Sequence, residues 1–225
     1  MKNLSIVIPV FNKWNFTKSC INDLMKLPED IEIIIIDNAS SDETQAELAK
    51  INLPNFVIVR NEENVFHSRA CNQGYALAQS DNVLFMNNDI RVKSNHSTWT
   101  QNVIDSCKDN MIAGPTMGLL DKGLNFVKEA NEVLAGNSYI GGWCLAGNKK
   151  TLSRLDLGTN QIWSERYPMY FNDTDLSFRA KKLGIKLAVI SLPDVIHFGK
   201  VSAVQLNIHK LYNEGRAVFL KDWNK

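Results

Sequence analysis

Four short apolar runs rich in β-branched residues recur through the first half of the chain, and they constrain the fold more than any other feature. Polar turn residues bound each run, and the runs are Leu4–Val10, Ile31–Asp37, Phe56–Arg60 and 83–86. The segments between them have helical spacing and supply the crossovers that parallel strands need, at 14–26, 42–50 and 68–79. We therefore predict an α/β fold with a Rossmann-like, mixed and mostly parallel sheet flanked by helices.

The composition narrows the class of protein. The chain has 225 residues, of which 44% are hydrophobic and 22% charged, as in a globular protein with one substantial core. Lysine and arginine number 25 against 24 acidic residues, so no net field attracts nucleic acid or an anionic membrane. The four cysteines form no C-x-x-C pair and are expected to be buried thiols.

The first apolar run is too short to span a bilayer, and no signal-peptide cleavage site follows it. We therefore expect a cytoplasmic protein without a transmembrane segment.

Beyond about Asp109 the regular alternation of strand-like and helix-like segments gives way to short segments that contain glycine. This change divides the chain into a half at 1–109 and a half at 110–225. The second half is predicted to hold a helix near 173–183, strands near 185–190 and 195–198, and a closing helix at 204–223. No linker or repeat separates the halves, so we expect a single domain, 1–225, with one shared sheet and a cleft between them. The closing helix could pack on the core, cover the site, form a dimer or lie on a membrane surface.

Polar residues follow the first two strands. Ser40 and Glu43 form a capping-box pattern that predicts a helix start just beyond Asp37. At its strand end, Asp37 can accept a hydrogen bond from the N–H of a nucleotide base. Pro9 and Phe11 could wall a base pocket, or they could simply end the first strand and fill the core.

The run Asn87-Asn88-Asp89 directly follows the fourth apolar run, and ligands bind at such strand ends in open α/β sheets. Mn²⁺ and Mg²⁺ prefer oxygen ligands and keep water and substrate phosphates in their shells, so one protein carboxylate can suffice. Asp89 is therefore a candidate metal ligand. A polar turn with no metal is the alternative.

The run Asn172-Asp173-Thr174-Asp175 precedes a helical pattern that Gly184 is expected to end. Asn172 is a candidate N-cap. In the first helical turn, the backbone dipole and free N–H groups keep Asp173 ionised, which suits a general base, although capping is the alternative. Asp175 stands four residues before Arg179 and predicts an ion pair within the helix.

Three weaker signals accompany these runs. His197 ends a short apolar strand and could complete a metal shell, or be structural. Gly142 and Trp143 place an indole beside a residue without a side chain, where a sugar ring or the core could pack. Arg69 and Asn72 could face a diphosphate, although a solvated arginine is the alternative.

In this order, the motifs resemble those of the family 2 glycosyltransferases, inverting enzymes with the GT-A fold. The resemblance spans nearly the whole chain, through 6–12, 37–44, 64–74, 87–89, 142–146, 173–179 and 197–199.

The resemblance implies that Asp37 binds the base, Asp89 is the metal-binding end of a degenerate DxD motif, Asp173 is the catalytic base and His197 approaches the metal. It further implies a divalent metal, Mn or Mg, and a UDP- or dTDP-sugar donor held by 1–109. The implied acceptor is a glycan or lipid-linked molecule held by 110–225. The expected location is the cytoplasm, with the inner face of a membrane as the alternative. The donor-binding residues implied are Pro9, Phe11, Asn12, Asp37, Ser40, Arg69, Asn72, Asn87 and Asn88. Those implied near the sugar or acceptor are Gly142, Trp143 and Asn172.

Three residues depart from the family pattern. Asn87 replaces the first acid of the DxD motif and leaves the metal a single carboxylate. Asn172 replaces the glutamate that often precedes the catalytic aspartate. Val65 stands where the family usually has glycine, so the backbone near the diphosphate is expected to differ.

Two other functions are alternatives for a chain with this layout. A sugar-phosphate nucleotidyltransferase needs a glycine-rich, basic phosphate loop after the first strand, and Asn12-Lys13-Trp14-Asn15 is not one. A catalytically silent nucleotide- or glycan-binding domain would not need Asp89, Asp173 and His197 together. We therefore expect metal-assisted, inverting sugar transfer, with Asp173 taking the proton of the acceptor hydroxyl.

Overall fold

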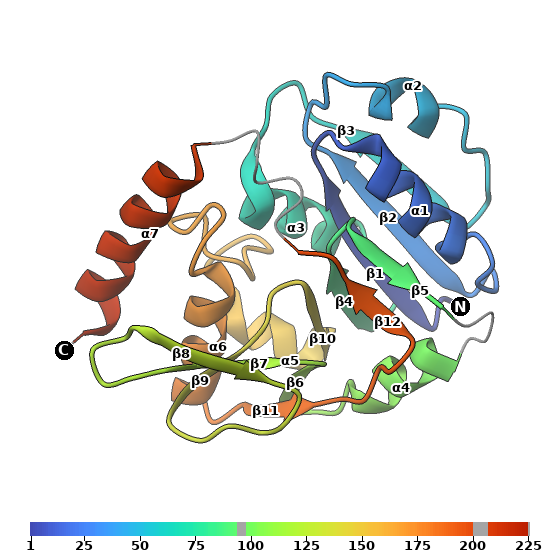
Figure 1. Cartoon of the computed structure of the whole chain (residues 1–225). Helices are drawn as coiled ribbons and strands as arrows, with labels where there is room; N and C mark the ends of the chain where they lie inside the picture. Colours follow the sequence, from blue (N-terminus) through green and yellow to red (C-terminus); the bar gives the residue numbers. More distant parts are fainter. Residues whose placement is uncertain (94–97, 200–206, 225) are drawn as a thin grey trace.

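The computed structural model describes residues 1–93, 98–199 and 207–224 (Figure 1). The strands are β1 Leu4–Val10, β2 Ile31–Asp37, β3 Phe56–Arg60, β4 Asn82–Met86, β5 Ile90–Val92, β6 Met111–Gly114, β7 Met117–Leu120, β8 Phe126–Ala130, β9 Asn137–Ile140, β10 Cys144–Asn148, β11 Lys186–Val189 and β12 Val195–His197. The helices are α1 Trp14–Leu24, α2 Thr44–Leu48, α3 Phe66–Leu77, α4 Thr98–Ser106, α5 Lys149–Leu152, α6 Asn172–Lys182 and α7 Ile208–Trp223, with a 3-10 turn at Ser153–Leu155.

The central sheet has seven strands in the order β11-β6-β10-β4-β1-β2-β3. Strands β1 to β4 pair in parallel, which confirms the prediction from the helical crossovers. Strand β10 runs antiparallel between β4 and β6, so the sheet is mixed, as expected. Strands from both halves of the chain thus hydrogen-bond to one another in the same sheet.

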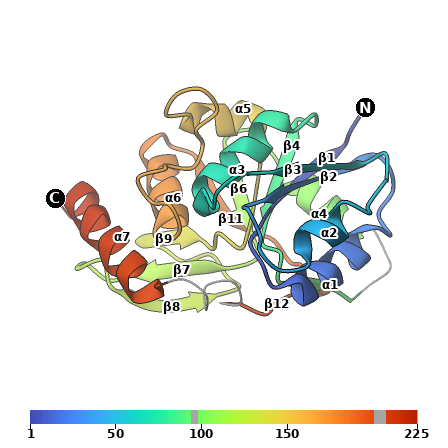
Figure 2. The ribbon, with the colours of Figure 1, turned by 90° about the horizontal axis from the view of Figure 1, so that it is seen from above.

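Helices cover both faces of this sheet (Figure 2). Because side chains alternate along a strand, Ile6 and Ile8 of β1 point to one face and Val7 to the other. The first face packs on α1, α2 and α4 and the second on α3, α5 and α6. Burial on both faces explains why β1 and β2 read as continuous apolar runs.

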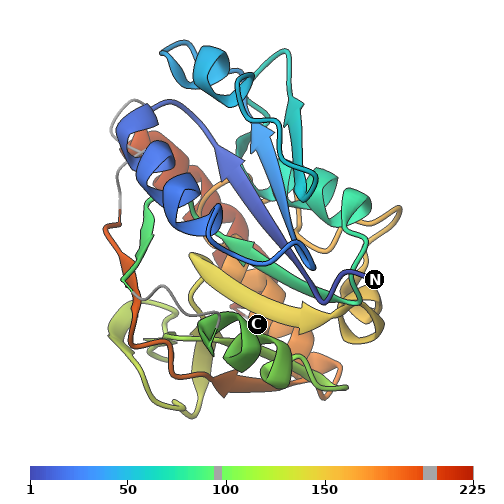
Figure 3. The ribbon, with the colours of Figure 1, turned by 90° about the vertical axis from the view of Figure 1, so that its right-hand side faces the viewer.

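Two small sheets lie beside the central one. Strands β8, β7 and β9 form an antiparallel sheet in that order, and β12 pairs with β5. Figures 1 and 3 both show β12 alongside β5. The strands predicted near 185–190 and 195–198 are present as β11 and β12, whereas β5 to β10 had not been predicted individually.

Two predicted helix caps are wrong. Helix α2 has Glu43 as its N-cap residue, without a side-chain cap, because the Ser40 hydroxyl instead accepts a hydrogen bond of 2.8 Å from Asn12 N. Helix α6 has Phe171 as its N-cap residue, in the left-handed region at φ 66°, and Asn172 is its first helical residue. The Asn172 amide nitrogen contacts α3, while its Oδ1 accepts a hydrogen bond from Asp173 N in the first turn of α6.

Other details of α6 agree with the sequence. Asp175 pairs with Arg179 at 2.8 Å, as predicted from their spacing. The helix ends at Lys182, and Gly184 follows it in the left-handed region at φ 69°.

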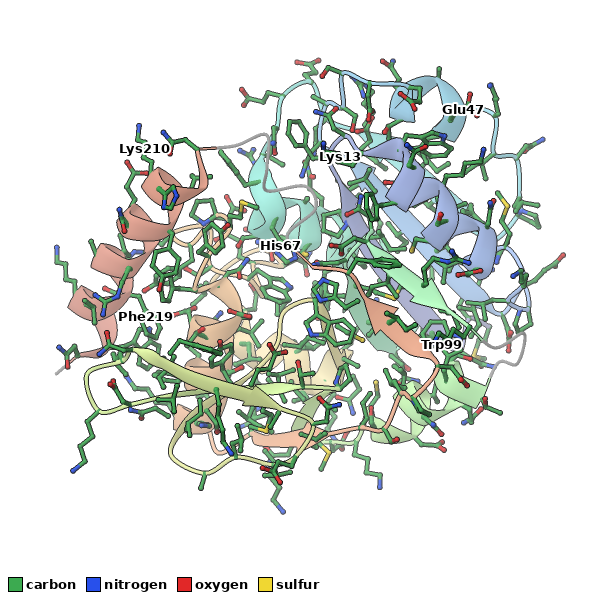
Figure 4. All side chains as sticks on the ribbon, in the orientation of Figure 1. Lys13, Glu47, His67, Trp99, Lys210 and Phe219 are labelled. Carbon is green, nitrogen blue, oxygen red and sulfur yellow. The ribbon has the colours of Figure 1, made fainter. Side chains whose placement is uncertain are left out.

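Helix α7 packs against α6 and the segment before it (Figure 4). Phe219 is fully buried, and the rings of Phe171 and Phe178 lie 5.2 and 5.6 Å from its ring. The closing helix begins at Ile208, and Val204 and Leu206 of the predicted segment lie outside the described residues. Within the ranges that the structure describes, no helix is both long and apolar enough to cross a bilayer.

Candidate active site

A cavity of about 320 Å³ lies at the carboxyl ends of β1 and β4, and residues from both halves of the chain line it. Predicted site residues that line it are Pro9, Phe11, Asn87, Asn88, Asp89, Gly142, Trp143, Asn172 and Asp173. Neither lysine nor arginine is among the described residues that line the cavity, whereas three carboxylates are, those of Asp89, Glu129 and Asp173.

His197 reaches the edge of this cavity through the pairing of β12 with β5. Phe198 N donates a hydrogen bond of 3.0 Å to the backbone oxygen of Asp89. This pairing places His197 Nε2 3.1 Å from Asp89 Oδ1 and 3.2 Å from Asn87 Nδ2. The Trp143 ring stacks on the imidazole at 4.7 Å between centroids and 7° between planes. The imidazole is therefore held in position on two sides.

Asp89 is buried, and the chemistry of its carboxylate fits a metal ligand. Its Oδ1 receives no hydrogen bond from any residue that the structure describes, because the close His197 contact lacks hydrogen-bond geometry. A buried, unpaired carboxylate oxygen is costly unless a cation or donor satisfies it. Asp89 and His197 are thus the side chains that would hold a divalent cation.

These two side chains do not form a complete metal site by themselves. Among residues 1–93, 98–199 and 207–224, no group of three or more His, Cys, Asp or Glu side chains is arranged to hold a metal. Mn²⁺ and Mg²⁺ commonly keep water and substrate phosphates among their ligands, so a site of two protein ligands depends on the substrate.

Asp173 projects into the cavity from the first turn of α6. Its Oδ2 accepts a hydrogen bond of 2.9 Å from Gly142 N, and its Oδ1 accepts one of 2.7 Å from Thr174 N. Burial raises the pKa of the Asp173 carboxyl, and the hydrogen bonds from Gly142 and Thr174 oppose that shift. Position 142 must be small, because a Cβ there would lie 2.9 Å from Asp173 Cβ.

Asn172 links this aspartate to α3. Its Nδ2 lies 3.0 Å from His67 Nδ1 and donates to Ser68 Oγ at 3.1 Å, while its Oδ1 accepts from Asp173 N at 2.9 Å. Burial lowers the pKa of His67 to about 4, so its ring is neutral at pH 7. An asparagine suits this neutral neighbour, which gives a local reason for the departure at position 172.

Asn12, Asp37 and Ser40 lie outside the cavity lining. Asp37 is buried, forms an ion pair with Arg60 and accepts a 3.0 Å hydrogen bond from Ser40 N. Asn12 Oδ1 accepts a 2.7 Å hydrogen bond from Ser41 N. These side chains tie together the loops that follow β1 and β2, and only their neighbours reach the cavity.

Asn72 and Arg69 on α3 are also outside the cavity. The Asn72 amide donates to Trp163 O and accepts from Trp163 N, both at 2.9 Å, and so fastens the segment before α6. Arg69 is exposed and lines a neighbouring hollow with Glu63 and Glu165. The sequence could not reveal these positions, because both depend on the distant segment around Trp163.

Several cavity residues were not predicted, among them Asn38, His67, Glu129, Tyr139 and Tyr170. Asn38 carried a usable signal, since it follows Asp37 at a strand end. Glu129 and Tyr139 lie on strands without the continuous apolar run that makes β1 and β2 visible in the sequence.

The sequence of residues 5–141, more than half of the chain, matches the profile of Glycosyl transferase family 2, and the chain belongs to this family. No protein of curated function matches the sequence.

Solved structures with a similar fold are glycosyltransferases. Mannosyltransferase PcManGT from Pyrobaculum calidifontis, in complex with GDP-Man and Mn²⁺, has a TM-score of 0.62 at 14% identity, over 83% of this chain and 54% of that one. TarS from S. aureus with UDP-GlcNAc has a TM-score of 0.66 at 17% identity, over 98% of this chain and 66% of that one. GalNAc-T7 with UDP, GalNAc and Mn²⁺ has a TM-score of 0.65 at 16% identity, over 83% of this chain and 42% of that one.

The chain thus spans 54% of the length of PcManGT, 66% of that of the TarS chain and 42% of that of GalNAc-T7. The likeness confirms the predicted GT-A fold, and the family assignment agrees with the resemblance inferred from the motifs.

Proposed function

We propose that the protein transfers a sugar from a nucleotide-sugar donor to a hydroxyl acceptor, with inversion and with the help of a divalent metal. One observation carries the proposal: Asp173 and the unpaired Asp89 oxygen share a cavity whose described lining includes no lysine or arginine. Membership of Glycosyl transferase family 2 supports the sugar transfer itself.

The charge of the cavity is the argument for a metal. A nucleoside diphosphate is anionic, and three carboxylates without a facing lysine or arginine would repel it. A cation held by Asp89 and His197 would supply the missing positive charge and neutralise the diphosphate as a leaving group. The Mn²⁺ in the PcManGT and GalNAc-T7 structures supports this choice, and Mg²⁺ has the same preference for oxygen ligands.

Asp173 acts as the general base in this proposal. Hydrogen bonds from Gly142 and Thr174 fix the carboxylate, so it is oriented before the acceptor arrives. Burial raises its pKa, which makes it a stronger base than an ordinary exposed carboxylate. Asp173 removes the proton as the acceptor oxygen attacks the anomeric carbon, and a single displacement inverts that centre.

The donor's base fits the end of the cavity near β1. Pro9, Phe11 and Asn38 provide apolar walls and one amide there. Asp37 supports this end through Ser40 and Arg60. The UDP and UDP-GlcNAc in TarS structures favour a uridine nucleotide, and a dTDP-sugar is the closest alternative.

The test is release of nucleoside diphosphate from a panel of UDP-, dTDP- and GDP-sugars by the full chain, with Mn²⁺, with Mg²⁺ or with EDTA. We expect release from one donor class that EDTA abolishes, and an inverted anomeric configuration of the product by ¹H NMR. Tight binding of a donor without release would support the silent binding domain instead. Formation of a nucleotide sugar from a nucleoside triphosphate and a sugar phosphate would support the nucleotidyltransferase.

A further inference from the structure

Glu129, Gly118 and Tyr139 lie side by side across the three-stranded sheet β8-β7-β9. Gly118 pairs with Glu129 of β8 on one side and with Tyr139 of β9 on the other. Residues paired across strands project from the same face of a sheet. All three line the cavity, so this face forms its outer end.

Gly118 leaves room on that face for the tyrosine ring. A Cβ at position 118 would lie 2.2 Å from Tyr139 Cζ, so the ring lies over the glycine, toward the strand that carries Glu129. Burial raises the pKa of the Tyr139 hydroxyl, and the negative charges of Asp173 and Glu129 add to that shift. Tyr139 and both carboxylates line the same cavity.

Glu129 stands at the mouth of the cavity and is exposed. Its carboxylate makes no hydrogen bond or ion pair with any of the residues that the structure describes, whereas neighbouring Lys128 pairs with Glu132 at 3.5 Å. Met169 and Tyr170 add apolar and aromatic surface to the cavity lining. An aromatic wall with carboxylates and no facing cation suits a ligand rich in hydroxyl groups.

We propose that this outer end binds the acceptor as a neutral or amine-bearing sugar ring, and that Glu129 rejects acceptors carrying a carboxylate or phosphate there. The proposal rests on the proposed function, because Asp173 must face the acceptor hydroxyl. Sugar hydroxyls donate to Glu129 while the ring lies against Tyr139. An anionic group would meet Glu129 and Asp173 with neither lysine nor arginine among the described residues that line the cavity.

The experiment measures binding without turnover. Saturation-transfer NMR on the full chain, with MgCl₂ and UDP, compares methyl glycosides of glucose, galactose and mannose that carry a hydroxyl, an ammonium or a carboxylate at C6. We expect the hydroxyl and ammonium forms of at least one sugar to bind, and the carboxylate form to bind about tenfold more weakly or worse. About 0.5 M NaCl should reduce this difference, because the charge of Glu129 is exposed and therefore screened.

In the variant Glu129→Gln, the affinity for the carboxylate form should come to within about threefold of the affinity for the hydroxyl form. Glu132→Gln is the matched control, since it removes the same charge from the exposed segment after β8 but outside the cavity, and it should leave the ratio unchanged. If Glu129→Gln fails to fold, the effect of NaCl on the native chain tests the proposal: salt should reduce the difference in binding between the carboxylate and hydroxyl forms.

Equal binding of the carboxylate form by the native chain, an unchanged ratio in folded Glu129→Gln, or no binding of any hydroxyl or ammonium probe would overturn the proposal. Because these measurements need no turnover, they can fail while nucleoside diphosphate release succeeds, and the reverse also holds.

Discussion

The carboxylate of Asp89 and the imidazole of His197 come from opposite halves of the chain, yet Oδ1 of the first lies 3.1 Å from Nε2 of the second. The antiparallel pairing of β5 with β12 sets this distance, together with the hydrogen bond from Phe198 N to Asp89 O. The two side chains thereby converge at the cavity edge, where Asp89 Oδ1 has no hydrogen-bond partner among the residues that the structure describes.

Replacing Asp89 with asparagine should raise the metal concentration needed for half-maximal activity by at least about 100-fold, more than the loss of an outer-shell partner costs. The amide keeps the shape of the side chain but removes the single carboxylate next to His197. A titration with MnCl₂ at fixed donor measures the effect. Asp81→Asn, at an exposed position before β4, is the control that should leave the titration unchanged.

Replacing Trp143 with leucine should weaken metal binding by about 10- to 100-fold while the fold is kept, since the stacked indole orients His197. The same titration measures the change. Thr116→Val removes only the 3.0 Å hydrogen bond from Trp143 Nε1 and should have a smaller effect. An unaltered titration in Trp143→Leu would show that the stacking does not position the imidazole.

Asp173 and Asp175 stand two residues apart on α6 and should behave oppositely when each becomes asparagine. Asp173→Asn should cut kcat by about 10²- to 10⁴-fold, since it removes a general base. Its Tm should not fall, because burial raises the pKa of Asp173 and the ionised carboxylate therefore destabilises the folded state at neutral pH.

Asp175→Asn should keep most of the turnover and lower the free energy of unfolding by about 1 to 3 kcal/mol, because it weakens a buried ion pair with Arg179. Steady-state kinetics and thermal unfolding of both variants separate the two roles. Near-normal kcat in Asp173→Asn would remove that residue from the chemistry.

His67 should make the fold less stable in mild acid. Its pKa is lowered to about 4 in the folded state, whereas an unfolded histidine titrates near about 6.5. Between these values only the unfolded state binds the proton, so the free energy of unfolding falls as the pH drops. At about pH 5, the titration of His67 should lower the free energy of unfolding by about 2 kcal/mol relative to pH 7.

Urea unfolding at several pH values measures this loss. His67→Gln should flatten the pH dependence between about pH 7 and 5. His209→Gln, at an exposed position on α7, should leave it as in the native chain. If the free energy of unfolding varies with pH equally in His67→Gln and in the native chain, the lowered pKa of His67 is contradicted.

Local sequence patterns predicted much of the framework. The buried strands β1 and β2 are visible in the sequence as apolar runs rich in β-branched residues, because both of their faces are covered by helices. The spacing of Asp175 and Arg179 and the position of Gly184 likewise predicted the course of α6, since these interactions lie within one helix. Asp173 and Asp89 could be singled out for the same reason: each stands at the end of an element visible in the sequence.

The tertiary structure alone decided which of the predicted polar residues line the cavity. Asp37 at the end of β2 pairs with Arg60, Asn72 on α3 bonds the backbone of Trp163, and both lie outside the cavity lining. Glu129 and Tyr139 gave no signal, because β8 and β9 lack the apolar runs of β1 and β2, and the two residues flank Gly118 of β7 only in the folded chain. Periodicity reports which face of an element is buried, whereas these contacts depend on strands and loops far apart in the chain.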